Sequence, residues 1–450
     1  MAMSLATPDK IRDLQIKLYR KAKNEPGFRF YQLYDKVYRE DLLHHAYALA
    51  KANQGAPGVD GESFEDIESR GLVLRLKSRL RRDGLEEWLN GLRKDLHDKT
   101  YQPQPVRRKM IPKPGGGERA LGIPTIRDRV AQTAAKLILE PIWEAEMEPN
   151  AYGYRPRKSA QEAVQKVDEL LHEGYTDVVD ADLSKYFDTI PHSELMQCVA
   201  RRIVDRHILH LIKMWLKVPV EERDEQGKRR LTGGKDRDRG TPQGGVVSPA
   251  LANLYMNRML KGWRKSKRGE QFRARIVNYA DDFVILSRGK ATEALGWTRG
   301  ILARLGLTLN EKKTSIRNAR RERFDFLGYT FGPHYSPRTG REYLGYSPSQ
   351  KSVSQMKQNV GELLERRNVA PWEEVRAKLN RKLRGWRQYF RCGSTRKAYQ
   401  AVDEYVYDGV RSFLRKRHKV SSQGTRQFPA ERVYGPLGVL RLQGPRGART

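Results

Sequence analysis

The stretch RIVNYADDFVILSR, residues 275–288, constrains the fold more than any other part of the sequence. Two adjacent aspartates, Asp281 and Asp282, separate two short runs that are rich in β-branched and aromatic residues. Aspartate is common in turns, so a plain turn is one interpretation of the pair. The flanking runs favour strands, however, and they predict a β-hairpin with the acidic pair at its tip.

A second acidic strand end comes earlier in the chain. In VVDADLSKYFD, residues 178–188, Asp182 follows an apolar strand. Three carboxylates brought together by two strand ends repel one another unless cations neutralise them. Oxygen ligands of this kind suit Mg²⁺, and two such ions support in-line phosphoryl displacement, the chemistry of nucleotidyl transfer. Asp180 lies on the same face of the strand as Asp182, so the choice of metal ligand between them stays open.

The charge of the chain indicates a polyanionic partner. Lys and Arg number 87 against 54 Asp and Glu, and the formal net charge is +33 in 450 residues. A surplus of this size destabilises a compact protein unless a polyanion neutralises it, and nucleic acid is the usual one. A solvated basic surface is the alternative interpretation.

Cysteine usage and hydropathy bear on the compartment. Cys198 and Cys392 are too far apart in sequence for a C-x-x-C zinc site, and their scarcity fits a reducing cytoplasm. No apolar run reaches the length of a membrane span. We therefore expect a soluble cytoplasmic protein, associated with the bacterial nucleoid, and no membrane partner.

Positive charge is concentrated near the C-terminus. Residues 345–450 hold nearly half of the excess, in under a quarter of the chain. Within them, VRAKLNRKLRGWRQYFR, residues 375–391, has apolar residues at helical spacing and Arg or Lys at most other positions. The apolar stripe predicts a packed helix, and the basic face predicts contact with phosphates. The residues expected to bind nucleic acid are Arg381, Arg384, Arg387 and Arg391.

Turn signals and periodicity predict the order of the other elements. Residues 1–100 are expected to be mainly helical, residues 109–125 a hairpin, and residues 127–147 a helix. A helix-rich stretch is expected over residues 192–217, followed by a loop or hairpin over residues 220–245. Local strand pairs with separate helices favour the α+β class over a parallel α/β sheet.

Several motifs, in a fixed order, resemble the reverse transcriptases of group II introns. The central ones are DADLSKYFDTIPH, RGTPQGGVVSPALANLYM and YADD. IPKPGGGERALGIPTIRDRVAQ and AYGYRPRKSAQEAV are similar to earlier blocks of that family, and LGLTLNEKKT and FLGYTF to later ones. LRGWRQYFR is similar to its thumb or maturase domain, and GAPGVDG to its N-terminal extension. One tetrapeptide is weak evidence, whereas an ordered series is strong evidence.

The resemblance implies a right-hand polymerase of the α+β class, with fingers, an antiparallel palm sheet that carries the YADD hairpin, and a helical thumb. It implies an N-terminal extension in residues 1–100 that binds template or RNA, fingers and palm in residues 101–340, and a basic thumb or maturase domain with a short tail in residues 345–450. Many family members end in a zinc-supported HNH endonuclease, whose Cys pairs this sequence lacks. DNA cleavage by the protein is therefore not expected.

The function implied is that of an RNA-directed DNA polymerase, which also binds intron RNA to assist splicing and retromobility. The expected partners are group II intron RNA, an RNA template with a DNA primer or DNA target, and deoxynucleoside triphosphates. The oligomeric state stays open. The alternatives are a splicing maturase that only binds RNA, and a domesticated reverse transcriptase that serves defence or repair.

The resemblance also implies a catalytic centre. Asp182, Asp281 and Asp282 are the expected catalytic and metal-binding triad, and the backbone carbonyl of Leu183 is a further expected ligand. The expected cofactors are two Mg²⁺ ions, with Mn²⁺ as an alternative.

Five residues are expected to bind the nucleotide: Lys113, Arg119, Phe187, Gln243 and Lys313. Lys113 and Arg119 would hold the triphosphate, unless their hairpin only touches the template backbone. Gln243 would contact the sugar, and Lys313 shares its assignment with the adjacent Lys312.

Phe187 is expected to select the sugar. The resemblance places this ring beneath the nucleotide, where it would collide with a 2′-hydroxyl, so DNA synthesis is expected. Two alternatives remain: Phe187 is a core residue, or Asp188, one residue later, marks a different register and accepts a hydrogen bond from that hydroxyl.

Overall fold

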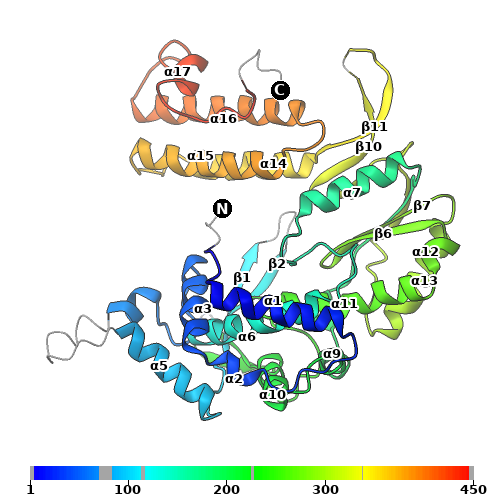
Figure 1. Ribbon diagram of the computed structural model, residues 1–450. Helices are drawn as coiled ribbons and strands as arrows, with labels where there is room; N and C mark the ends of the chain where they lie inside the picture. The colour runs from blue at the N-terminus through cyan, green and yellow to red at the C-terminus, as the bar shows by residue number, and fades with distance from the viewer. Residues whose placement is uncertain (1–4, 70–83, 113–116, 224–227, 337, 445–450) are drawn as a thin grey trace.

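The computed structural model describes residues 5–69, 84–112, 117–223, 228–336 and 338–444 (Figure 1). Helices and locally paired strands occur in separate groups, so the predicted α+β class is confirmed. None of the described helices is both long and apolar enough to cross a membrane.

A four-stranded antiparallel sheet, here called the palm sheet, lies at the centre of the chain. Its strand order is β6-β7-β3-β8. Its strands are β3 (Asp177–Ala181), β6 (Ala274–Tyr279), β7 (Asp282–Ser287) and β8 (Ser315–Asn318). The hairpin predicted around the acidic pair is confirmed, because β6 and β7 pair directly.

Side chains of the palm sheet alternate between two buried faces, as the pleat of a strand requires. Val178 of β3 packs in one hydrophobic core with α7 (Ala160–His172), and Val179 packs in the large core on the opposite face. The local sequence starts α7, because Ser159 and Glu162 form a capping box. These two layers fix the strand ends that carry the aspartates.

A second sheet, here called the fingers sheet, has the order β2-β1-β4-β5. Its strands are β1 (Val106–Pro112), β2 (Glu118–Ile123), β4 (Val220–Arg223) and β5 (Arg229–Thr232). The predicted hairpin over residues 109–125 is confirmed by the antiparallel pairing of β1 with β2. The expected loop or hairpin over residues 220–245 contains the β4–β5 hairpin, and β4 joins β1 in parallel.

The N-terminal region is helical, as predicted, in the residues described. It contains α1 (Asp9–Asn24), α2 (Tyr34–Val37), α3 (Glu40–Ala52) and α5 (Gly84–His97). The helix predicted over residues 127–147 is α6 (Ile126–Glu144), which is buried along most of its length. Both α1 and α3 pack against α6.

The predicted helix-rich stretch over residues 192–217 contains two helices, α9 (His192–Ala200) and α10 (Arg206–Leu216). Asp205 separates them, because its carboxylate accepts hydrogen bonds from the backbone N–H groups of His207 and Ile208 and so caps α10. Further helices lie between β3 and β6 in the chain: α8 (Tyr186–Thr189), α11 (Ser248–Lys265) and α12 (Arg268–Gln271). After β7 comes α13 (Ala291–Arg304).

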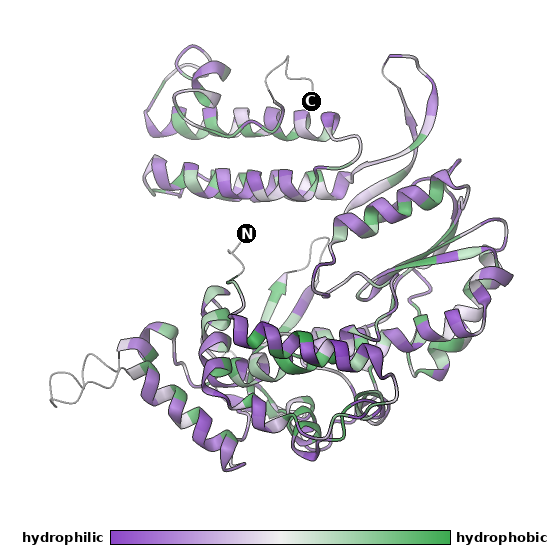
Figure 2. Cartoon of the chain, in the orientation of Figure 1, coloured by the Kyte–Doolittle hydropathy of each residue, from purple (hydrophilic) through white to green (hydrophobic). Residues whose placement is uncertain are grey.

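A three-stranded sheet leads into the C-terminal helices, which we call the thumb helices. The strands are β9 (Phe324–Phe326), β10 (Tyr329–Tyr335) and β11 (Glu342–Pro348), and the helices are α14 (Gln350–Leu363), α15 (Trp372–Tyr389), α16 (Arg396–Arg417) and α17 (Ala430–Tyr434). The helix predicted over residues 375–391 is therefore confirmed. Val375, Leu379 and Leu383 of its stripe are fully buried, and most of the other residues of α15 are hydrophilic (Figure 2).

Candidate active site

Strand pairing brings the predicted acidic residues together. Ala181 at the end of β3 lies opposite Phe283 of β7. The next pair in this antiparallel register is Asp182 and Asp282, and opposite residues of a pair share one face of the sheet. Asp281 lies in the two-residue turn between β6 and β7. We call Asp180, Asp182, Asp281 and Asp282 the acidic cluster.

The hairpin tip is held from both sides. Ala280 has a φ of 59°, the positive value that a tight hairpin turn requires at its first position. The buried amide of Asn278 donates a 2.8 Å hydrogen bond to the Ala280 carbonyl. On the other side, Gly153 packs so closely that a Cβ there would lie 2.4 Å from the Ala280 nitrogen. These contacts fix the position of Asp281.

Electrostatic repulsion is built into the acidic cluster. Desolvation and repulsion from Asp281, Asp182 and Asp180 raise the pKa of Asp282 to about 6. Desolvation also raises the pKa of Asp281, although Arg119 partly offsets this. The pKa of Asp180 is raised to about 6, mainly by desolvation. Part of Asp282 remains open to solvent, so cations can reach the cluster.

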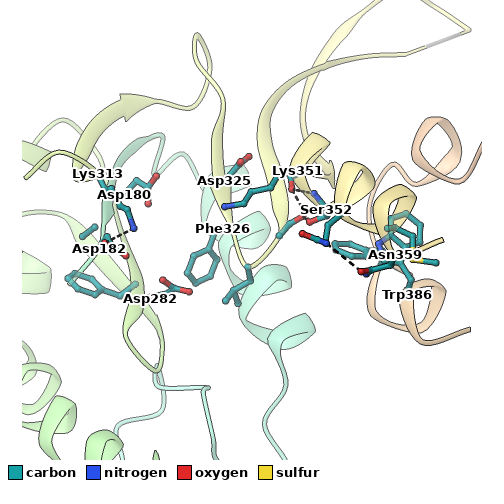
Figure 3. A pocket seen from close by; sticks show the side chains of 18 residues that line it. Asp180, Asp182, Asp282, Lys313, Asp325, Phe326, Lys351, Ser352, Asn359 and Trp386 are labelled. Carbon is teal, nitrogen blue, oxygen red and sulfur yellow. Dashed lines mark hydrogen bonds and ion pairs between the residues drawn. The ribbon is translucent and has the colours of Figure 1, made fainter. Parts of the chain in front are cut away.

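Asp182 already has a cationic neighbour. Lys313 Nζ lies 3.2 Å from Asp182 Oδ2 (Figure 3). The Asn310 side-chain amide donates to the same oxygen at 3.2 Å. The backbone N–H of Asn310 donates to the Asp182 carbonyl at 2.8 Å. The structure thus places Lys313 at the acidic cluster. Lys312 is exposed.

The carboxylates of the acidic cluster fit a divalent cation whose remaining ligands are water and substrate phosphates. Among the residues described, no group of three or more Asp, Glu, His or Cys side chains stands close enough to hold a metal ion by itself. Mg²⁺ typically binds through one or two carboxylates, with water and substrate phosphates as the other ligands. Repelling carboxylates at the edge of a cleft match that requirement. Leu183, the other expected ligand, has a buried side chain and a backbone bridge to Leu309.

A cavity of about 530 Å³ joins the acidic cluster to the thumb helices. Asp182, Asp282 and Lys313 line one part of it, whereas Lys351 and Trp386 line another (Figure 3). The sequence reasoning did not single out Lys351. A helix-capping serine could have pointed to this residue. Ser349 caps the start of α14, which places Lys351 in the first helical turn, at the same cavity as Asp182.

A second cavity, of about 320 Å³, lies between the fingers sheet and the segments that carry Asp188 and Gln243. Two expected nucleotide contacts meet there, because Arg119 Nε donates a 2.9 Å hydrogen bond to Gln243 Oε1. Lys185 and Asp188 also line it. Lys113 lies outside the described residues.

Phe187 is only 7% exposed and belongs to the large hydrophobic core. Its ring contacts Tyr186 edge to face, and its carbonyl accepts a 2.7 Å hydrogen bond from the Thr241 backbone N–H. The core interpretation of Phe187 therefore agrees with its burial. Its neighbour Asp188 is exposed in the second cavity.

The four arginines expected to bind nucleic acid lie on and just after α15. Arg381, Arg384, Arg387 and Arg391 are all exposed. Within the described part of the chain, none of their side chains forms an ion pair or a hydrogen bond. Their guanidinium groups are therefore available to an external anion.

Comparisons with known proteins identify the family. Residues 111–331 match the description "Reverse transcriptase (RNA-dependent DNA polymerase)", and residues 353–429 match "Group II intron, maturase-specific domain". Protein YkfC of Escherichia coli (strain K12) is 33% identical, over 71% of this chain and 87% of that protein.

Two longer relatives match in part. Group II intron-encoded protein LtrA of Lactococcus lactis subsp. cremoris is 32% identical, over 52% of this chain and 35% of that protein. The putative COX1/OXI3 intron 1 protein of Saccharomyces cerevisiae (strain ATCC 204508 / S288c) is 28% identical, over 64% of this chain and 38% of that protein. The chain thus spans just over a third of the length of these two relatives. It belongs to the family of reverse transcriptases that carry a group II intron maturase domain.

Proposed function

We propose that this RNA-directed DNA polymerase transfers deoxynucleotides to a primer at the acidic cluster, with Asp182, Asp281 and Asp282 as its catalytic residues. The observation that carries the proposal is the register of β3 and β7, which sets Asp182 opposite Asp282 at the edge of a cavity, with Asp281 in the adjoining turn. A protein that only bound RNA would gain nothing from such repulsion.

Reverse transcriptases depend on divalent metal ions, and the proposed cofactors here are two Mg²⁺ ions. When held by these aspartates together with water and substrate phosphates, such ions would stabilise the attacking and leaving oxygens of an in-line displacement. Lys313 forms an ion pair with Asp182 and so offsets part of the negative charge of the acidic cluster. Asn310 fixes the orientation of the Asp182 carboxylate. Asp182 and Asp282 are therefore held in place at the edge of the first cavity.

The nucleotide is proposed to enter the second cavity, between the fingers sheet and the segments that carry Asp188 and Gln243. Lys113 and Arg119 would bind the triphosphate, whose negative charge grows on the leaving pyrophosphate. Gln243 would donate to the sugar, and Phe187 would exclude a 2′-hydroxyl. What supports this role is the place of Phe187 directly before Asp188, which lines that cavity.

The domain roles are proposed in the same terms. Residues 1–100 would form an extension that binds template or intron RNA, residues 101–340 the fingers and palm, and residues 345–450 the thumb or maturase domain. Unpaired exposed arginines on α15 support an RNA-binding surface that assists splicing. Retromobility would follow if the bound RNA is the intron that encodes the protein.

The test is primer extension on an RNA template with Mg²⁺, using either deoxynucleotides or ribonucleotides, by the native protein and by Phe187→Ala. We expect the native protein to extend with deoxynucleotides only. The variant should accept ribonucleotides, because the wall beneath the sugar is removed. Tight RNA binding without extension by the native protein would replace this proposal with that of a splicing maturase.

A further inference from the structure

The side-chain amide of Gln243 is held at both ends. Its Oε1 accepts a hydrogen bond from Arg119 Nε at 2.9 Å, and its Nε2 lies 3.3 Å from both carboxylate oxygens of Asp188. A guanidinium can only donate and an ionised carboxylate can only accept. Only one of the two amide orientations satisfies both neighbours, so Asp188 and Arg119 together determine which way Gln243 points.

The backbone holds Asp188 and Gln243 in a fixed relation. Segments 187–192 and 238–243 run side by side and are joined by three hydrogen bonds of 2.7–2.8 Å. The donors are the N–H groups of Thr241, Gly240 and His192, and the acceptors are the carbonyls of Phe187, Ile190 and Asp238. A Cβ at Gly240 would lie 2.9 Å from the Asp188 carbonyl, so the two segments approach as closely as glycine allows.

Charge in the same cavity favours this arrangement. Arg237 lines the cavity next to Asp188 and forms no ion pair within the described ranges. Desolvation lowers the pKa of Arg237, and the negative charge of Asp188 opposes that shift. Asp188 thus lies where its carboxylate can accept from Gln243 and also offset the positive charge of Arg237.

We propose that Asp188 is a positioning residue for the incoming nucleotide, acting through Gln243 and Arg119. One Nε2–H of Gln243 is donated to Asp188, which leaves the other free to donate to a sugar hydroxyl. The carbonyl end of the same amide holds Arg119 at the triphosphate. The inference rests on the proposed function, because it assigns these two residues to the nucleotide site.

Asp188→Asn is the direct test, because it preserves size while adding a donor. With an amide at position 188, either orientation of Gln243 finds a partner there. Only Arg119 then still selects the orientation, so Gln243 is held less firmly. In single-nucleotide incorporation on an RNA template, we expect the Kd for the deoxynucleotide to rise on the order of tenfold. The rate at saturating nucleotide should change less than about threefold, since the residue does not touch the reacting atoms.

Asp238→Asn is the matched control. It makes the same charge change in the facing segment, and its exposed side chain has no hydrogen bond or ion pair within the described ranges. Its nucleotide Kd should stay within about twofold of the native value, by the usual tolerance of surface positions. An equal rise in Kd for both variants would mean that only the net charge of the cavity matters, and would overturn the inference.

A double variant separates positioning from a structural role. If Asp188 acts through Gln243, then Asp188→Asn should have almost no further effect on Kd in a Gln243→Ala background. Additive effects, or an unchanged Kd in Asp188→Asn alone, would overturn the inference. The native protein is the reference in each series. Absence of extension by the native protein would refute the proposed function itself, which is a different outcome.

Discussion

Gly153→Ala is the change whose effect follows most directly from the geometry of the hairpin tip. The added Cβ would lie 2.4 Å from the Ala280 nitrogen and 2.9 Å from the Tyr279 carbonyl carbon, whereas ordinary contacts begin at 3.4 Å. Both neighbours are backbone atoms, so no side-chain rotation can relieve the overlap. The tip must shift by about 1 Å, at a cost in stability of roughly 1–3 kcal/mol.

That shift would displace Asp281 from Asp182, because Asp281 directly follows Ala280 in the turn. A displacement of about 1 Å in a catalytic group lowers rates by roughly a hundredfold. Single-turnover primer extension on an RNA template measures the loss, and urea unfolding measures the stability. We expect the rate to fall by that amount while the variant remains folded and binds template–primer normally.

Gly296→Ala is the matched control, since Gly296 lies in α13 with no atom within 4 Å of the added Cβ. This variant should keep full activity and gain roughly 0.5–1 kcal/mol, because alanine favours helix over glycine. Native activity in Gly153→Ala would refute the claim that the tip is held by this contact.

Three further outcomes follow. Asp282→Asn should raise the free energy of unfolding near pH 7 by on the order of 1 kcal/mol, allowing for solvent exposure, and change it little below pH 4. The reason is that the pKa of Asp282 is about 6 in the folded protein, so ionising this carboxyl costs folding free energy once the pH exceeds its pKa in the unfolded chain. Urea unfolding at both pH values measures the difference, and a variant less stable than the native protein at pH 7 would contradict the prediction. Replacing Arg384 and Arg387 with Gln should reduce the salt dependence of RNA binding by about one unit of log–log slope each, and unchanged slopes in filter binding would exclude them as phosphate contacts. Leu383→Ala should destabilise the thumb by roughly 2–5 kcal/mol, because its side chain is fully buried; a loss under about 1 kcal/mol in urea unfolding would contradict this packing.

The sequence predicted what depends on local chemistry. The β6–β7 hairpin was predictable because two strand-forming runs flank a two-residue turn. The helix over residues 375–391 was predictable from its apolar spacing, and Leu379 and Leu383 occupy the expected buried stripe. Ordered motifs then assigned the family, which no single stretch could have done.

Contacts between distant segments could not be predicted in this way. The single helix-rich stretch expected over residues 192–217 is divided at Asp205, whose carboxylate also accepts hydrogen bonds from the N–H groups of Leu33 and Tyr34. A local sequence pattern cannot show that one carboxylate caps a helix and also binds a segment about 170 residues earlier in the chain. The close approach of Gly153 to the hairpin tip, and the contact of Asp188 with Gln243, are likewise products of tertiary packing.

Primer extension on an RNA template with deoxynucleotides and Mg²⁺, by the native protein and by Asp281→Ala, tests the central claim most directly. Asp408→Ala, which removes an exposed carboxylate of α16, serves as the control. The account predicts extension by the native and control proteins, a loss of at least a thousandfold in Asp281→Ala, and equal RNA binding by all three. Extension by Asp281→Ala at a near-native rate would contradict the assignment of catalysis to the acidic cluster.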